Sequence, residues 1–195
     1  MSQEVFQYSK YLSLILRHMP DKAGITLDAN GWTDVKELLF KTKTRMEFLE
    51  RVVATNDKKR FEFNDDKTKI RACQGHSVDI DLKLTPAEPT ETLYHGTANR
   101  NKALIEGNGL DKMNRQYVHL SRDVETALKV GQRHCGMKDT IVFRVAALQM
   151  HKDGFKFFLS ANGVWLTERV PAQYLSIWSK AEITPMVLEP FTGLF

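Results

Sequence analysis

The sequence predicts an α+β fold in two parts, a helical N-terminal part and a strand-rich C-terminal part. Most of the helical spacing of apolar residues falls within the first 54 residues, whereas strand-like runs bounded by turns dominate after residue 93. Between these regions, Leu84–Thr92 contains two prolines and two acidic residues, a composition typical of a linker. We therefore expect a first domain at residues 1–83, a linker at 84–92 and a second domain at 93–195.

Length and composition are those of an ordinary globular protein. Of the 195 residues, 42% are hydrophobic and 27% are charged. The net charge of +4 permits an anionic partner such as RNA without requiring one. Cys73 and Cys135 form no CxxC motif and are too few for a disulfide framework. No apolar run reaches membrane-spanning length, and Met1–Lys10 lacks the apolar core of a signal peptide. We expect a cytoplasmic protein with no membrane partner and, because no coiled-coil pattern is present, a monomer.

Three helices and a hairpin are predicted in the first part. The predicted elements are helices at Gln3–His18, Asp34–Phe40 and Thr44–Ala54, then strands at Arg60–Asn64 and Lys67–Cys73. Pro20 is expected to terminate the first helix, Thr33 to cap the second, and a capping box at Thr44–Glu47 to open the third. This element order is that of a winged-helix domain. Many such domains bind nucleic acid, although a fold alone does not establish that function.

The second part is predicted to alternate strands with two short helices. The predicted elements are strands at Leu93–Tyr94, Tyr117–Leu120, Thr140–Ala146, Phe155–Ser160, Val164–Thr167, Leu175–Trp178 and Glu182–Leu188, and helices at Asn99–Glu106 and Val124–Gly131. Gly107 and Gly109 are expected to end the first of these helices. An Asn-Gly turn at 162–163 joins a hairpin, and Arg133 falls in a basic turn after the second helix.

Two histidines follow strand-like segments in the second part. His95 and His119 are expected at the ends of two strands that lie side by side. Gly96, next to His95, is a position where backbone amides approach a flat or anionic ligand closely. These features describe the floor of a nucleotide site. Two hydrogen-bonded histidines in an ordinary sheet describe them equally well.

Candidate phosphate-binding residues occur in the first part. Arg17 and His18 fall on the last turn of the first helix, where the helix dipole alone already favours a cation. Arg71 and His76-Ser77 follow on the second predicted strand and the turn after it. A solvated strand residue and a polar turn explain these positions as well, so spacing alone leaves both interpretations open.

Seven sequence blocks, in a fixed order over almost the full chain, carry a resemblance. They are LSLILRHMP (Leu12–Pro20), GITLDANGWTDVKELL (Gly24–Leu39), IRACQGHS (Ile70–Ser77), LYHGT (Leu93–Thr97), VHLS (Val118–Ser121), VGQRH (Val130–His134) and SANGVWLTERVPAQYL (Ser160–Leu175). With these blocks the sequence strongly resembles the NAD-dependent RNA 2′-phosphotransferase family (KptA type). The resemblance implies a winged-helix lobe joined to a lobe similar to ADP-ribosyltransferases, which bind NAD in a cleft of split antiparallel sheets.

The resemblance also implies a role for individual residues. It assigns catalysis to Arg17, His18, Arg71 and Arg133, with Arg115 as the alternative for the fourth. It assigns NAD binding to His95, Gly96, Thr97, His119, Leu120, Ser121 and Val164. It assigns phosphate or RNA binding to His76, Ser77 and Arg115. Val164 stands where ADP-ribosyltransferases often carry a glutamate. No metal is implied, because the histidines lack a zinc-ligand spacing and arginines supply the positive charge.

The implied reaction consumes NAD and has two steps. An RNA 2′-phosphate attacks the nicotinamide-bearing ribose carbon, and the neighbouring 2″-hydroxyl then attacks the phosphorus. The products are 2′-hydroxyl RNA, nicotinamide and ADP-ribose 1″,2″-cyclic phosphate. The phosphate is already anionic, so charge compensation by arginine is needed rather than a general base. The RNA is tRNA in eukaryotic members of the family. Two alternatives are an ADP-ribosyltransferase that caps terminal phosphates of RNA or DNA, and a non-catalytic winged-helix protein that binds nucleic acid.

Overall fold

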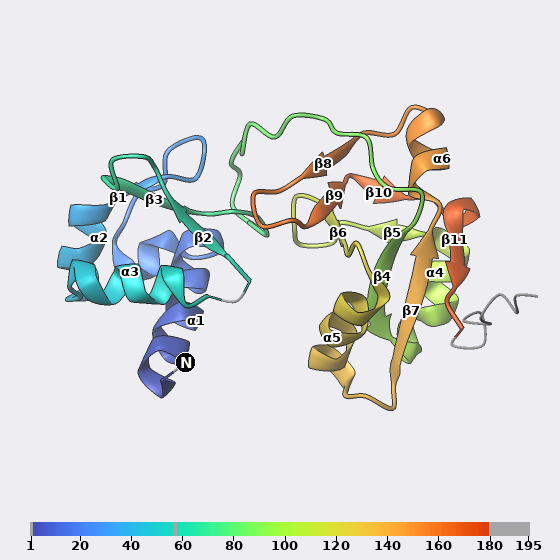
Figure 1. Cartoon of the computed structure of the whole chain (residues 1–195), viewed down its shortest axis with the longest axis horizontal. Helices are drawn as coiled ribbons and strands as arrows, with labels where there is room; N and C mark the ends of the chain where they lie inside the picture. Colours follow the sequence, from blue (N-terminus) through green and yellow to red (C-terminus); the bar gives the residue numbers. More distant parts are fainter. Residues whose placement is uncertain (1, 57, 180–195) are drawn as a thin grey trace, which may run out of the picture.

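The computed structural model describes residues 2–56 and 58–179, which form an α+β structure with several small antiparallel sheets. It contains two hydrophobic cores. One gathers buried residues between Val5 and Ala72, and the other gathers buried residues between Leu93 and Val170. The elements around these cores lie side by side, and the segment that joins them passes over the top of the view in Figure 1.

The first part is built on a three-stranded sheet and three α-helices. Its elements are α1 (Gln3–Arg17), η1 (Pro20–Ala23), β1 (Thr33–Asp34), α2 (Val35–Thr42), α3 (Met46–Ala54), β2 (Phe61–Phe63) and β3 (Lys69–Ala72). Strand β3 lies between β1 and β2 and is antiparallel to both. The predicted α1 is confirmed, with Leu12, Ile15 and Leu16 fully buried along one face. Each such side chain contributes about 1.5–3 kcal/mol relative to exposure.

The start of α2 differs from the predicted cap. Thr33 was expected at the N-cap, but it is buried in β1, where it pairs with Ile70 of β3. Asp34 is the N-cap instead, and its carboxylate accepts a hydrogen bond of 2.8 Å from the backbone N–H of Glu37. A buried strand position therefore displaced the cap by one residue, because the pairing with β3 fixes the direction of the Thr33 side chain.

The predicted capping box at the start of α3 is wrong. Arg45 is the N-cap of this helix and makes no side-chain cap hydrogen bond. Thr44 turns away from the helix, and its hydroxyl donates to the carbonyl of Thr42 over 3.2 Å. Lys43, in the left-handed region at φ 52°, ends α2 and sets the direction of this connection. The tight connection between α2 and α3 therefore decides which groups reach the helix end.

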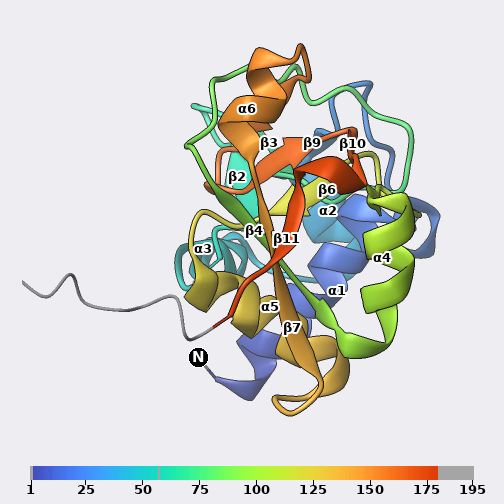
Figure 2. The same ribbon diagram turned by 90° about the vertical axis from the view of Figure 1, so that its right-hand side faces the viewer.

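The described residues of the second part form three sheets. Its elements are β4 (Leu93–Ala98), η2 (Asn99–Asn101), α4 (Lys102–Asn108), β5 (Leu110–Asp111), β6 (Val118–Leu120), α5 (Val124–Cys135), β7 (Thr140–Val145), α6 (Ala147–Lys152), β8 (Phe157–Leu159), β9 (Trp165–Thr167), β10 (Arg169–Val170), η3 (Ala172–Tyr174) and β11 (Leu175–Ile177). The sheet orders are β11-β7-β4, β6-β9-β8 and β10-β5, with antiparallel pairing throughout. Figure 2 shows β4, β7 and β11 running side by side.

Several predicted boundaries in the second part move. β4 continues to Ala98, so His95 lies within the strand and not at its end. α5 continues to Cys135, so Arg133 lies on a helix and not in a basic turn. Gly107 is inside α4, and Gly109 alone ends it. The hairpin of β8 and β9 around the Asn-Gly turn is confirmed. The strand expected over Glu182–Leu188 lies outside the described residues.

The segment expected to be a linker packs against the second part. The backbone N–H of Ala87 donates to the carbonyl of Phe157 over 2.8 Å, and Pro86 forms an isolated β-bridge with Phe158. The side chain of Ala87 also packs on the second core, although the sequence suggested no core residue here. In residues 2–56 and 58–179, no helix has the length and apolar character needed to cross a membrane.

Candidate functional site

Arg17, at the end of α1, is half-buried, and two of its nitrogens are enclosed without a partner. Its Nε and Nη2 atoms are enclosed and make no hydrogen bond to any described residue. Burial, together with the charges of Arg60 and Arg115, lowers the pKa of Arg17 to about 10, so the guanidinium stays protonated at neutral pH. Burying an uncompensated charge is costly. This arrangement is therefore suited to receive an anion.

The loop after β3 closes over the end of α1. The backbone N–H of Ser77 donates to the carbonyl of Arg17 over 2.9 Å. The Ser77 hydroxyl lies 2.9 Å from Nδ1 of His18. Burial and then the neighbouring charges of Arg17 and Arg115 lower the pKa of His18. Arg17, His18 and Ser77 thus meet at one place, as predicted.

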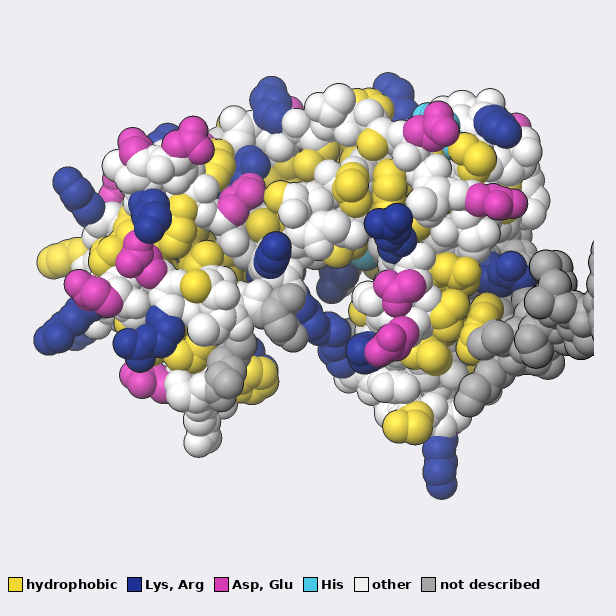
Figure 3. Space-filling view, viewed as in Figure 1, with side chains coloured by type: hydrophobic (Ala, Val, Ile, Leu, Met, Phe, Trp, Pro, Cys, Tyr) yellow, Lys and Arg dark blue, Asp and Glu magenta, His cyan; other side chains and the backbone are white. Residues whose placement is uncertain are grey.

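Gly75 makes this closure possible. Its φ is +90°, and a Cβ atom there would lie 3.7 Å from Nη1 of Arg17 and 3.8 Å from Nε2 of His119. The loop therefore lies between the two parts of the molecule and touches a candidate residue from each. Figure 3 shows the surface hollowed between the two parts, with Lys and Arg side chains on both sides of the hollow.

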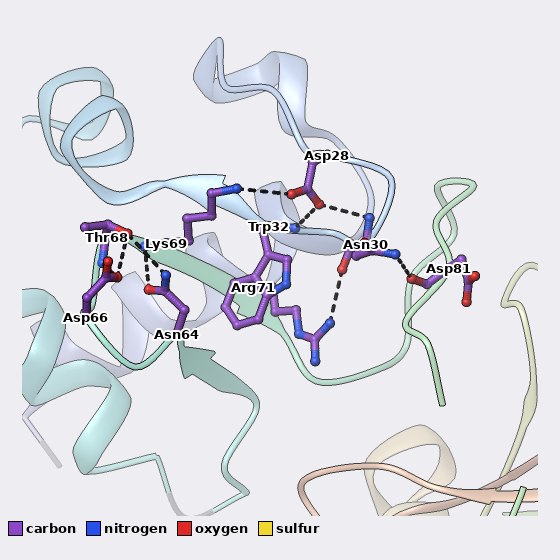
Figure 4. A network of polar contacts seen from close by, with 9 residues as sticks. All are labelled: Asp28, Asn30, Trp32, Asn64, Asp66, Thr68, Lys69, Arg71 and Asp81. Carbon is purple, nitrogen blue, oxygen red and sulfur yellow. Dashed lines mark hydrogen bonds and ion pairs between the residues drawn. The ribbon is translucent and has the colours of Figure 1, made fainter. Parts of the chain in front are cut away.

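Arg71 is held on β3 by three contacts, and Figure 4 shows two of the partners, Trp32 and Asn30. Its Nε donates to the carboxylate of Glu62, the residue paired with it across the hairpin, over 2.6 Å. The guanidinium carbon lies 4.4 Å from the ring centre of Trp32, and Nη1 donates to the carbonyl of Asn30 over 3.4 Å. Arg71 therefore has a fixed orientation, with part of its charge compensated by Glu62.

His76 is a buried residue within electrostatic range of Arg17, His18 and Arg71. Only 1% of its surface is exposed, and neither ring nitrogen has a hydrogen-bond partner among the described residues. Burial lowers its pKa to about 3, and the charges of Arg17, His18 and Arg71 act in the same direction. His76 is therefore neutral, with one donor and one acceptor available. Four residues predicted from two separate sequence blocks, Arg17, His18, Arg71 and His76, therefore act on one another here.

The two candidates for the fourth cation differ in position. Arg115 is exposed in the loop before β6, and its charge lowers the pKa values of Arg17, His18 and His119. Arg133 is exposed on α5, the helix that Figure 1 shows on the side of the second part facing the first. Arg115 is therefore the one of the two whose charge acts on Arg17, His18 and His119, while Arg133 belongs to α5 of the second part.

His95 and His119 are neighbours, as predicted. Nδ1 of His95 lies 3.1 Å from the backbone carbonyl of His119. Nδ1 of His119 lies 3.0 Å from the carbonyl of Tyr117, and its Nε2 lies 2.6 Å from Oε1 of Gln74 in the first part. Their strands belong to different sheets, which meet at an isolated bridge between Tyr94 and Ser121.

His119 is a neutral residue at the contact between the two parts. Burial and the charge of Arg115 lower its pKa to about 3. A neutral ring donates one hydrogen bond and accepts one. The carbonyl of Tyr117 requires the proton on Nδ1, which leaves Nε2 as an acceptor. Gln74 satisfies that acceptor when its amide is turned to present nitrogen instead of oxygen.

Gly96 has a packing role that the sequence did not indicate. A Cβ atom there would lie 1.7 Å from the carbonyl oxygen of Ala127 on α5. A Cβ on Gly131 of α5 would likewise lie 2.6 Å from the Thr140 side chain and 3.0 Å from the backbone nitrogen of Thr97. The two glycines bring α5 against β4. The space that Gly96 leaves is filled by this helix and not by a ligand.

The remaining predicted NAD-site residues are fixed by local contacts. Thr97 is buried, and its hydroxyl accepts a hydrogen bond from Asn101 over 3.0 Å. Leu120 is enclosed in the second core, so its side chain supports the sheet. Ser121 forms the bridge to β4, and half-buried Val164 lies just before β9. These residues surround the strands that carry His95 and His119.

Sequence reasoning missed three contributors. Gln74 connects the first part to His119, and Glu62 and Trp32 orient Arg71. The predicted hairpin contained both Glu62 and Arg71, but a two-residue turn at Asp65-Asp66 would pair Glu62 with Lys69, so the ion pair had no signal in the sequence. The other two contacts join distant segments and had none either. In the described part of the chain, no group of three or more His, Cys, Asp or Glu residues is arranged to hold a metal ion.

Two hollows on the first part lie apart from the candidate residues. Cavities of about 290 and 540 Å³ lie in the first part, and neither is lined by a predicted site residue. The buried, unpartnered nitrogens of Arg17 and His76 locate the site better than cavity volume does, because they require a ligand or water. The candidate residues lie at the hollow between the two parts.

The two buried neutral histidines predict a pH-dependent stability. His76 and His119 have pKa values of about 3 when folded and an ordinary value near 6.5 when unfolded. The unfolded chain therefore binds more protons below pH 6.5, and their contribution to stability is lost as pH falls through the 6.5–3 window. Urea unfolding at pH 7 and pH 5 is expected to show a loss of about 2–4 kcal/mol. H119Q should halve this loss, and an unchanged pH dependence in that variant would contradict the assignment.

Comparison with known proteins places the chain in a family. Residues 3–169 match the family described as RNA 2′-phosphotransferase, Tpt1 / KptA family. The chain is 52% identical over 176 residues to a probable RNA 2′-phosphotransferase of Flavobacterium johnsoniae, covering 88% of this chain and 95% of that relative. Similar proteins of the same description occur in Hahella chejuensis (47% over 182 residues, 91% and 96% covered) and Burkholderia pseudomallei (49% over 172 residues, 86% and 92% covered). The chain belongs to the RNA 2′-phosphotransferase family, a family of transferase enzymes.

Proposed function

We propose that this protein removes an internal 2′-phosphate from RNA in an NAD-dependent, two-step reaction. The observation that carries the proposal is the buried guanidinium of Arg17, which lacks a hydrogen-bond partner for Nε and Nη2 among the described residues. His18, Ser77 and His76 lie around it. A phosphate monoester supplies the negative charge and acceptor oxygens that such a cluster requires.

The proposed lobes follow the division expected from the sequence. Residues 1–83 would form a winged-helix lobe that binds RNA and phosphate, 84–92 a linker, and 93–195 an NAD-binding lobe similar to ADP-ribosyltransferases. The three helices with a β2–β3 hairpin support the first assignment. The separate antiparallel sheets that meet near His95 and His119 support the second.

NAD suits the residues on the second side of the hollow. Bound NAD would supply the ribose carbon that accepts the RNA phosphate, together with nicotinamide as the leaving group. His95, Thr97, His119 and Ser121 would line its site. Neutral His119 is suited to hydrogen bonding a ribose or an amide, and the cations of the hollow to a diphosphate. Leu120 and Gly96 would act indirectly, by holding β6 and by seating α5.

The protein's own groups would position the phosphate and not abstract a proton from it. Arg17 and Arg71 would neutralise and orient its oxygens, and His18 would orient it or move a proton in the second step. The Nε atom of Arg71 already donates to Glu62, so the guanidinium would contact Glu62 and the substrate phosphate at the same time. We further propose that the protein is a monomer. We also propose that it is located in the cytoplasm, and the unpaired cysteines Cys73 and Cys135 support this location.

Release of nicotinamide tests the proposal. The full chain is incubated with NAD and either an RNA carrying one internal 2′-phosphate or the same RNA with a 2′-hydroxyl. Nicotinamide is expected only with the phosphorylated RNA, because the phosphate is the nucleophile. Equal release with both RNAs would indicate simple NAD hydrolysis. No release with either would exclude the reaction.

Arg133 and Arg115 are expected to differ in kinetics. If Arg133 stabilises the reacting phosphate, R133A lowers kcat by roughly 10²–10³-fold. If Arg115 contacts RNA before and during the reaction alike, R115A raises the KM for RNA several-fold and leaves kcat near the wild-type value. Steady-state kinetics with varied RNA at saturating NAD separates these effects. The opposite pattern would move the fourth catalytic position to Arg115.

A further inference from the structure

A groove of about 540 Å³ lies on the first part, away from the candidate site. Aromatic side chains of Tyr8 and Tyr11 on α1 and Phe48 on α3 line it. The connection between α2 and α3 adds the exposed cations Lys43 and Arg45. Glu4 is the one acidic residue in this lining, so the groove carries a net positive charge.

The aromatic side chains form a fixed platform. The rings of Tyr8 and Phe48 are 5.4 Å apart in an edge-on arrangement, and those of Tyr8 and Tyr11 are 6.2 Å apart. The Tyr8 hydroxyl is hydrogen-bonded to Thr42 over 3.0 Å. All three rings pack against the first core and remain half-buried. Packing on the core explains why one face of each ring is apolar and buried. It does not explain why Lys43 and Arg45 also line the groove.

Helix α1 connects this groove to the phosphate cluster. Tyr11 precedes His18, the C-cap of α1, by seven residues or about two helical turns, so the groove and His18 lie along the same side of this helix. The rise of the helix separates them by about 10 Å. A stacked nucleic acid strand rises by about 3.4 Å per nucleotide, so roughly three nucleotides span this distance.

We propose that the groove binds single-stranded RNA that flanks the 2′-phosphate, with bases on the tyrosine rings and phosphates on Lys43 and Arg45. The inference rests on the proposed function, because it requires an RNA phosphate held near His18. Stacked bases suit the aromatic platform, and the two cations suit the backbone between them. The enzyme would then act faster on a 2′-phosphate with RNA on both sides of it than on the same 2′-phosphate in a dinucleotide.

Substrate length tests this site. The values of kcat/KM are measured for a dinucleotide with a 2′-phosphate and for an octamer that contains the same dinucleotide at its centre. Wild-type enzyme is expected to prefer the octamer about tenfold. In K43N/R45Q this preference should fall to near unity, with the dinucleotide value unchanged. Asn tolerates the left-handed backbone at position 43, so the fold is retained. K152Q/K156Q removes two exposed lysines from the second part and should keep the wild-type preference.

Salt dependence gives a second measurement. Loss of two phosphate contacts should lower the slope of log KM for the octamer against log salt concentration by about 1.4. Wild-type enzyme that turns over both RNAs equally, or a K43N/R45Q variant that keeps the preference and the slope, would overturn the groove and leave the proposed function intact. Absence of turnover on both RNAs by the wild type would instead overturn the proposed function, and the groove with it.

Discussion

Replacing Arg17 with methionine is expected to lower kcat/KM by roughly 10²–10³-fold while leaving the protein at least as stable as the wild type. The guanidinium is buried, and two of its nitrogens have no hydrogen-bond partner among residues 2–56 and 58–179. Under the proposed function, its removal deprives the substrate phosphate of its main charge contact. The same change relieves the folded protein of an uncompensated charge and adds an apolar side chain of similar length.

Two measurements on the same sample test this expectation. Turnover of 2′-phosphorylated RNA gives the loss of activity, and urea unfolding gives the change in stability. R51M, which alters an exposed arginine on α3, is the matched control and should change neither by much. A loss of more than about 2 kcal/mol of stability in R17M would mean that Arg17 holds the fold and not the substrate.

Among the substitutions proposed here, replacing Gly96 with alanine is expected to lower the free energy of unfolding the most, by about 3 kcal/mol or more. The new methyl group would overlap the carbonyl oxygen of Ala127, which belongs to the backbone and cannot rotate away. Helix α5 must then shift from β4, taking Arg133 with it. For a chain of this size, thermal unfolding should begin roughly 6–12 °C lower.

A second glycine provides the control for this substitution. Gly107 lies inside α4, and a Cβ atom there would meet nothing within 4 Å. G107A should raise stability by about 0.5–1 kcal/mol, because alanine is the better helix former. If G96A were as stable as G107A, the close packing of α5 on β4 would be contradicted.

Local sequence patterns predicted elements better than their ends. The apolar spacing of α1 and the Asn-Gly hairpin of β8 and β9 depend on residues near one another, and both are confirmed. The caps at Thr33 and Thr44 failed because pairing with β3 and the tight turn after α2 decide the local geometry. The predicted end of β4 was wrong for a similar reason: β7 pairs with β4 along its whole length, so the strand continues through Ala98.

The candidate site could be predicted residue by residue but not in its arrangement. The motif blocks contained Arg17, His18, Arg71 and His76, which the fold brings within electrostatic range of one another. Nothing local indicated that Glu62 compensates Arg71. Nothing local indicated that Gly96 faces a helix either, because the same glycine fits both a ligand and close packing. Such assignments depend on contacts between segments far apart in the chain.

The fate of the phosphate is the most direct test of the account. An RNA with one radiolabelled internal 2′-phosphate is incubated with the full chain, with and without NAD, and all labelled products are resolved. The account predicts NAD-dependent transfer of the label to ADP-ribose 1″,2″-cyclic phosphate and a 2′-hydroxyl left on the RNA. A label that stays on the RNA as a stable ADP-ribosylated phosphate would contradict it and indicate a transferase that stops after the first step. A label unchanged in the presence of NAD would contradict the enzymatic account and leave a protein that only binds nucleic acid.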